Sequence, residues 1–371
     1  MAKNRIIYQS QSVYAGPSAV SGTYYSETGD EAASARSAHP SSLQRVQNVN
    51  YSFDIARTDV NQFGQLASID RVILESPTVS MDFSYYQADF ANEKKIGFHI
   101  MDSSTLTSCI SGMLTRESDE RNYYIRVTSE GNDSVGFSST GTGVNDVVGI
   151  GNAFMSSYSS DASVGDFPTA SVTVEALNIA FDKGTTGNKL PKVNPADGSK
   201  ESTKQYALPT ATGNVQNSYS VVRPGDITLD LNNGGLGATI SDAKIQSYSL
   251  SFDLAREPLQ KLGNKFAFAR EMTFPVTVSL SVDALLGDLT TGNLADVIDS
   301  DDDFNAEINM KTRSSETVNM RYILKKAKLD GHSYSTSIGD NKTVTLNFSS
   351  QIGSSQQTGV GLFMSGVGHN A

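Results

Sequence analysis

The residues of this chain that could do chemistry are few and scattered. The acidic segment 299–303, Asp-Ser-Asp-Asp-Asp, is the nearest approach to a calcium-binding loop. An EF-hand needs Gly at its sixth position and Glu at its twelfth, where this chain has Phe304 and Met310. We therefore expect a solvated loop or an electronegative rim there rather than a bound cation. The four histidines lie far apart in the sequence, at His39, His99, His332 and His369.

Glycine and cysteine patterns point away from catalysis as well. Gly141–Gly143 fails the dinucleotide-binding pattern because position 146 is Asp, and Gly149–Gly151 fails it because position 154 is Phe. No Walker segment or nucleophile elbow is present. The single cysteine, Cys109, falls on the apolar face of a predicted helix, where burial is the expected role. We expect no enzymatic activity, no bound metal and no cofactor.

The strongest feature of the sequence is an internal duplication. Residues 46–83 return 199 positions later, so that Phe53–Arg57 (FDIAR) matches Phe252–Arg256 (FDLAR), and about 11 of roughly 38 positions are identical. A period near 200 residues is too long for a solenoid or a propeller blade. The sequence therefore predicts two tandem domains, 1–200 and 201–371, each burying a core of its own.

Charged residues that occur in both copies are candidates for an assembly role. They are Asp54 and Arg57 in the first copy, and Asp253 and Arg256 in the second. In one interpretation each Asp and Arg form an ion pair that finishes a strand. In the other, Arg57 and Arg256 occupy equivalent places in a ring and contact the next domain, since arginine makes planar, bidentate contacts at fixed joints.

Hydrophobic periodicity predicts a mainly β protein with one short helix in each domain. Residues 46–55 and 79–85 alternate apolar and polar side chains, as do their second copies, which is typical of half-buried strands. A helix capped by Asp102 or Ser103 is expected to run through Leu114, and a shorter one over 291–298.

Later strands repeat at a different offset. Residues 163–166 and 172–174 correspond to 337–340 and 344–346, which is an offset of 174. The first copy should thus hold roughly 25 extra residues, expected in an extended loop near 131–151. Two further stretches without periodicity, 16–43 and 184–224, are expected to be long loops, and the second contains the domain boundary.

Composition sets the environment and the partners. The formal net charge is −11, so the surface is not expected to grip nucleic acid, because affinity for phosphates comes mostly from Lys and Arg. One cysteine excludes internal disulfides, and no apolar run is long enough to cross a membrane. We expect a protein made in soluble form in the cytoplasm, without a signal peptide or a membrane contact.

Two related segments resemble the tail tube proteins of long-tailed bacteriophages. They are Tyr158–Thr169 running into the strand 170–174, and Tyr334–Asp340 running into the strand 343–348. The resemblance implies two β-sandwich or barrel domains, each flanked by a helix. It further implies a homotrimer with pseudo-sixfold symmetry around a channel that passes double-stranded DNA without holding it, and stacking of these rings into the tail tube.

The same resemblance implies a place in the virion, with baseplate, terminator and sheath proteins as neighbours. An alternative within the same class is a low-copy baseplate hub or distal tail ring built on the same domain. A second alternative is a carbohydrate-binding β-sandwich, which would need exposed aromatic clusters for sugar stacking. That interpretation is weakened by the absence of Trp, although Tyr24-Tyr25 and Tyr123-Tyr124 could serve.

Overall fold

The structure of the protein is a computed structural model. It describes residues 10–18, 40–101, 106–114, 119–128, 133–134, 146–183, 188–200, 205–206, 208, 221–232, 244–285, 303–312, 318–335 and 343–366. The predicted helix over 291–298 and most of the predicted loop 16–43 lie outside these residues.

The described chain is mainly β, as predicted, with sixteen of its strands joined in one sheet. A first set, called here the first repeat, comprises β1 (Gln11–Pro17), β2 (Ser41–Ser42), β3 (Val46–Asp54), β4 (Thr58–Val60), β5 (Asp70–Val72), β6 (Thr78–Tyr86), β7 (Ile100–Met101), β8 (Arg121–Val127), β9 (Asp146–Ser163), β10 (Thr169–Ala176) and β11 (Asn178–Lys183). The second repeat comprises β14 (Ile227–Asn232), β15 (Lys244–Asp253), β16 (Arg256–Leu259), β17 (Ala269–Met272), β18 (Val276–Leu285), β19 (Phe304–Lys311), β20 (Val318–Ser335), β21 (Thr343–Ile352) and β22 (Gly361–Gly366). Between them lie β12 (Asn188–Lys189) and β13 (Gln205–Tyr206), and the helices are α1 (Ala91–Ile96), η3 (Cys109–Met113) and η5 (Pro224–Asp226).

The two repeats have the same strand order and the same register. In the first repeat the order is β3-β6-β10-β9, and in the second it is β15-β18-β21-β20. Bulges fall at equivalent residues, at Gln47 and Gln246 (246 − 47 = 199) and at Ser156 and Asp330 (330 − 156 = 174). A positive φ recurs at Asn152 (52°) and Lys326 (55°), again 174 apart. The two sequence offsets therefore describe one structural repeat.

A long strand joins two sheets in each repeat. β9 and β20 have 18 residues each. Their C-terminal parts belong to the four-stranded sets above, while their N-terminal parts pair with β8 and β11, or with β19 and β22. Each repeat is thus compatible with a β-sandwich whose two sheets share one strand. The burial pattern of β6 agrees with a sandwich that has one inner and one outer face. Its odd-numbered residues 79–85 are buried, while the even-numbered ones face outward.

The repeats are joined edge to edge into one eight-strand layer. β15 of the second repeat pairs antiparallel with β9 of the first, which gives the order β3-β6-β10-β9-β15-β18-β21-β20. One hydrophobic cluster runs through both repeats, from Val13 to Met364. The cores of the two repeats are therefore continuous, because pairing across the joint places apolar side chains of both repeats in contact. The domain boundary at residue 200 stays a prediction.

Helix predictions were only partly right. The segment predicted as a helix up to Leu114 is described from residue 106 onward, and this part forms the short 3-10 helix η3. The helix α1 lies earlier in the chain. Ser, Thr and Gly lower the helix propensity of this segment, and packing decides its conformation. A Cβ on Gly112 would lie 2.5 Å from the carbonyl oxygen of Gly97, so the turn sits directly against the end of α1.

The extra residues of the first repeat are also placed differently. β8 and β19 correspond at an offset of 183, since Arg121 pairs with Ala153 as Phe304 pairs with Ala327. Of the 25 extra residues, 199 − 183 = 16 therefore lie between β6 and β8, and 183 − 174 = 9 lie between β8 and β9. The predicted loop at 131–151 is wrong from Asp146 onward, where β9 begins.

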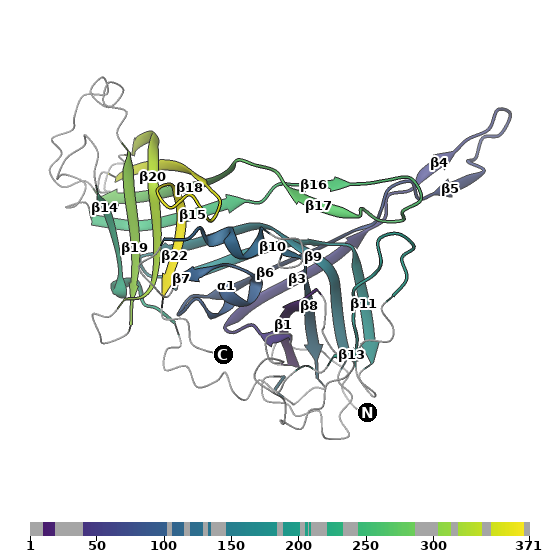
Figure 1. Cartoon of the computed structure of the whole chain (residues 1–371), viewed down its shortest axis with the longest axis horizontal. Coiled ribbons are helices and arrows are strands. Elements are labelled where there is room, and N and C mark those ends of the chain that lie inside the picture. Colours follow the sequence, from purple (N-terminus) through teal and green to yellow (C-terminus); the bar gives the residue numbers. More distant parts are fainter. Residues whose placement is uncertain are drawn as a thin grey trace.

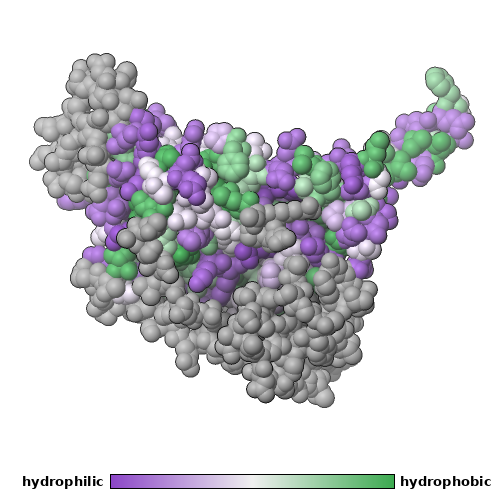
Figure 2. Space-filling view, in the orientation of Figure 1, coloured by the Kyte–Doolittle hydropathy of each residue, from purple (hydrophilic) through white to green (hydrophobic). Residues whose placement is uncertain are grey.

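Each repeat carries a long hairpin. β16–β17 runs along the first repeat, whereas β4–β5 projects from the molecule (Figure 1). Both turns contain a glycine with positive φ, Gly64 (84°) and Gly263 (89°), as expected from the conserved spacing of the duplication. Figure 2 shows hydrophobic residues at the projecting tip, where Phe63 and Leu66 are fully exposed.

Candidate functional site: the joint and its free edges

The joint between the repeats is held by a ladder and a cluster of aromatic rings. Seven residue pairs connect β15 to β9, from Ser247–Ser163 to Asp253–Ser157. On the buried side, the ring of Phe252 lies 5.6 Å from that of Tyr158 and 6.0 Å from that of Phe98, centroid to centroid. Such contacts make the joint part of the protein core.

An ion pair closes the joint beside this ladder. The guanidinium of Arg256 binds both carboxylate oxygens of Asp119, at 2.6 and 2.8 Å, and its Nε donates to the carbonyl oxygen of Met155 at 2.9 Å. Both side chains are nearly buried, with 2% and 9% exposed. Burial raises the pKa of Asp119, and its hydrogen bond with Arg256 acts in the opposite direction.

The four predicted interface residues are therefore in unequal environments. Arg256 connects the second repeat to the first, and its partner is Asp119 rather than the neighbouring Asp253, which is exposed. Asp54 and Arg57, the equivalent residues of the first repeat, are exposed at the end of β3. The ring-interface role of these residues stays a prediction.

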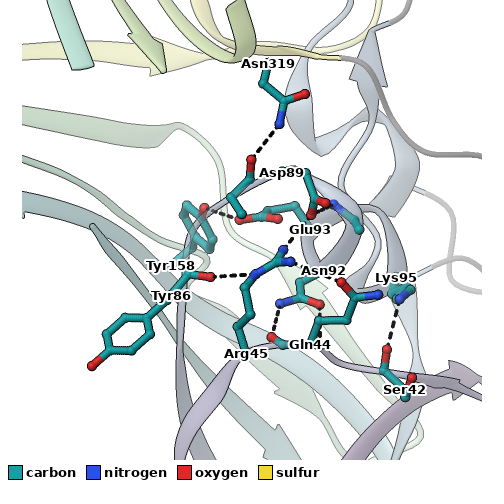
Figure 3. A network of polar contacts seen from close by, with 12 residues as sticks. Ser42, Gln44, Arg45, Tyr86, Asp89, Asn92, Glu93, Lys95, Tyr158 and Asn319 are labelled. Carbon is teal, nitrogen blue, oxygen red and sulfur yellow. Dashed lines mark hydrogen bonds and ion pairs between the residues drawn. The ribbon is translucent and has the colours of Figure 1, made fainter. Parts of the chain in front are cut away.

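A buried polar network fixes α1 beneath the joint (Figure 3). Arg45 pairs with Asp89 at 2.6 Å, while the Asn92 side chain exchanges two hydrogen bonds with the backbone of Gln44, both at 2.8 Å. Asn319 of the second repeat donates to the carbonyl oxygen of Ala88 at 2.6 Å. These bonds hold the chain leading into β3 against α1, and they tie the residues just before α1 to β20.

Glu93 lies at the buried end of this network. The hydroxyl of Tyr158 donates to its Oε1 at 3.1 Å, and that hydroxyl lies 2.7 Å from the hydroxyl of Tyr322 in β20. Burial raises the pKa of Glu93 from 4.5 to about 7 and lowers the pKa of Lys95 to about 8. A carboxyl group inside the joint therefore gains a proton in the physiological pH range.

In the first repeat, the strand equivalent to β15 is β3, whose outer edge has no described partner strand. In β15, Leu250 is fully buried and Phe252 is 3% exposed; in β3, the equivalent Tyr51 is 36% exposed and Phe53 is 57% exposed. Among the described residues, β3 pairs with β6 alone. A sheet edge with exposed aromatic residues on its core-facing side is a template for another strand.

The opposite end of the eight-strand layer carries the matching edge. In the part of the chain that the structure describes, the C-terminal segment of β20 pairs with β21 only. Applying the two offsets to the pair Leu250–Ser160 gives 250 − 199 = 51 and 160 + 174 = 334. The register would thus place Tyr51 opposite Tyr334, which is 45% exposed. Each molecule thus has two edges, β3 and the C-terminal part of β20, that correspond to the two strands of its internal joint, β15 and β9.

The outward side of the eight-strand layer is polar and has few basic residues, which are Lys244, opposite Leu285, and Lys328, opposite Ser349. Its strands present mostly Ser, Thr and Asn on this side, together with six carboxylates, at Asp54, Asp82, Asp161, Glu175, Asp253 and Asp283. No Lys or Arg occurs within residues 48–54, 78–86, 157–163, 169–176, 247–253, 276–285, 331–335 and 343–352. Such a surface disfavours a polyanion, because its carboxylates outnumber the cations that could replace phosphate counterions.

Several of these polar groups bond to each other across strands. Asp283 accepts from Ser247 at 2.7 Å and from Thr345 at 2.5 Å. Asp82 accepts from Asn50 at 2.8 Å. Hydroxyl and amide donors that are occupied in this way are less available to a passing ligand.

Much of the site could not be found from the sequence. Asp119 and Glu93 are distant from the duplicated block and belong to no motif, so nothing in the sequence indicated their contacts. Of the acidic run 299–303, the described member Asp303 pairs with Lys328 at 2.9 Å. Cys109 is buried, as predicted. Within the described ranges, no group of three His, Cys, Asp or Glu could hold a metal ion.

No described helix is long and apolar enough to cross a membrane. No protein-family model and no curated protein matches the chain. Among solved structures, a chain from "Cryo-EM structure of the anti-feeding prophage (AFP) baseplate, 6-fold symmetrised" is similar to 38% of this chain and 91% of its own length, with 15% identity and a TM-score of 0.25. A likeness of this size assigns neither a family nor an activity.

Proposed function

We propose that this protein is a structural virion protein whose chains close into rings, and that the rings stack into a phage tail tube. The observation that supports it most is the contrast between β15 and β3. The same strand of the duplication is buried against β9 inside the chain and exposed at the free edge, with its complement at the far end of the same layer.

Head-to-tail pairing of β3 with β20 of a neighbouring chain would repeat the internal joint. A contact between two different surfaces of identical chains gives a ring when its rotation closes. Three chains with eight strands each would give a layer of 3 × 8 = 24 strands. With strands about 4.8 Å apart and tilted about 40°, that layer would measure roughly 48 Å across its backbone, wide enough for an aqueous channel.

The polar side of the layer would then line the channel. Its hydroxyl groups and carboxylates, with few Lys and no Arg, suit a passage through which double-stranded DNA moves without adsorbing. In this role the chain needs no catalytic group, and its partners are its own copies, adjacent tail proteins and the passing genome. A low-copy baseplate hub or distal ring would use the same joint.

Electron microscopy of the purified protein at high concentration tests the proposal. The expected particles are trimers and stacked hollow rings with pseudo-sixfold symmetry. A chain that remains monomeric at high concentration contradicts the proposal. Copy number in purified virions separates the two tail roles, since a tube protein should be among the most abundant components and a hub should be present in a few copies.

A further inference from the structure

The internal joint has a second ladder on its outer layer. β7 of the first repeat pairs in parallel with the outer edge of β22 in the second, through Ile100–Met364 and Met101–Ser365. With β7 in place, Phe363 and Met364 of β22 are 0% exposed. The first repeat therefore pairs with β15 of the second repeat in one layer, and its own β7 pairs with the second repeat in the other layer.

In the first repeat, β11 is the equivalent of β22, but no described strand pairs with its outer edge. Asn178 pairs with Gly151 as Gly361 pairs with Lys325, and 151 + 174 = 325. Among the described residues, β11 pairs only with β9. Phe181 is 67% exposed, whereas its counterpart Met364 (364 − 181 = 183) is fully buried.

The exposed Phe181 belongs to the core-facing side of its strand. Ile179, two residues earlier and on the same side, packs against the main hydrophobic cluster. Covering an aromatic side chain of this size stabilises an interface, because apolar surface is removed from water. The opening beside Phe181 is therefore an incomplete sandwich edge rather than ordinary surface.

We propose that the outer edge of β11 is a second assembly edge, which accepts a strand from the second repeat of a neighbouring chain. The inference rests on the proposed ring. If the neighbour's second repeat accepts β3, the relation seen inside the chain requires that it return a strand to β11.

This second ladder would give the ring joint two separated lines of contact. The β3–β20 ladder holds the layer around the channel, and the contact at β11 would hold the outer layer. Two lines of contact prevent one repeat from hinging about the other, as β7 and β15 do within the chain. The partner is accordingly a second copy of this chain, in the same ring.

A photo-crosslinking experiment on the assembled protein tests the inference. The variant Phe181→p-benzoylphenylalanine is assembled from a mixture of isotopically light and heavy chains, irradiated and mapped by mass spectrometry. We expect mixed-isotope crosslinks to peptides from the second repeat. Val164→p-benzoylphenylalanine, at an equally exposed turn residue (66%), is the matched control and should give no mixed-isotope crosslinks to the second repeat. Crosslinks from position 181 that stay within one chain or map elsewhere overturn the inference.

A substitution pair gives a second measurement. Phe181→Asn should lower the dissociation temperature of assembled rings, Phe181→Leu should largely preserve it, and both should leave the unfolding of the unassembled chain unchanged. Rings that form normally with an unchanged dissociation temperature in Phe181→Asn contradict the role of β11 while leaving the proposed function standing. Failure of the wild-type chain to assemble contradicts both.

Discussion

Arg256 and Asp119 form a bidentate ion pair between residues 137 positions apart, one in each repeat. The equivalent arginine of the first repeat, Arg57, is exposed at the free edge. The equivalent residues Arg256 and Arg57 thus differ in environment: Arg256 lies at the joint formed within the chain, and Arg57 lies at an edge without a described partner.

The two arginines should respond differently to truncation. Arg256→Ala is expected to lower the free energy of unfolding of the unassembled chain by about 3 kcal/mol, because it leaves the nearly buried Asp119 without its partner. Arg57→Ala should change it by less than about 0.5 kcal/mol. Urea unfolding measures both values, and sedimentation velocity should show impaired assembly for Arg57→Ala. Equal stability losses would contradict the assignment.

Glu93 should make stability depend on pH. Because burial raises its folded pKa to about 7, its contribution is fully present below about pH 4.5 and is lost as the pH rises through 7. Glu93→Gln, which keeps an acceptor for Tyr158, should remove this dependence and gain on the order of 3 kcal/mol above pH 7. Urea unfolding between pH 5 and 8 measures this dependence, with Glu75→Gln, at an exposed carboxylate, as the control. A slope unchanged in Glu93→Gln would refute this role.

Positive charge on the polar side of the layer should make assembled particles retain DNA. Ser171→Lys and Ser279→Lys introduce cations at exposed positions, two in each chain. We expect salt-sensitive binding of duplex DNA, whereas wild-type particles should not bind. Gel-shift titration at several salt concentrations measures this, with Val164→Lys, at an exposed turn, as the control. Equal binding by the control and the layer variants would argue against a channel lining.

The β4–β5 hairpin should become protected on assembly. Arg57 and Arg71 are exposed in the single chain and are substrates for trypsin. In rings, the hairpin should lie along the neighbouring chain as β16–β17 lies along the first repeat, so that cleavage slows. Limited proteolysis at matched concentrations of assembled and unassembled protein measures the difference. Identical cleavage rates would place the hairpin outside the ring interface.

Local patterns predicted the strands well. Alternation in residues 79–85 and in the strand from Thr343 placed β6 and β21, because a half-buried strand imposes a period of two on its residues. α1 was missed because six residues give too little periodicity, and the predicted helix became η3 because packing against Gly97 overrides weak propensity.

Contacts across the joint could not be predicted. The duplication indicated that two copies exist, but not that β15 would pair with β9 in the same molecule, since pairing between repeats leaves no periodic signal. Arg256 could be named from the repeat, while Asp119 could not, because its role depends on three-dimensional proximity alone. Comparing the burial of equivalent residues, such as Phe53 and Phe252, requires the fold.

The most direct test of the ring joint is a disulfide at the register that the internal ladder dictates. Ser251 pairs with Ser159, so the corresponding residues are Ser52 (251 − 199) and Ser333 (159 + 174) in neighbouring chains. The variant Ser52→Cys/Ser333→Cys is oxidised under assembling conditions and analysed by non-reducing electrophoresis. Ser159→Cys/Ser251→Cys is the matched control, which should link within one chain. The account predicts covalent species that end at three chains. Chains that remain unlinked while the control links, or a ladder that continues beyond three, would contradict it.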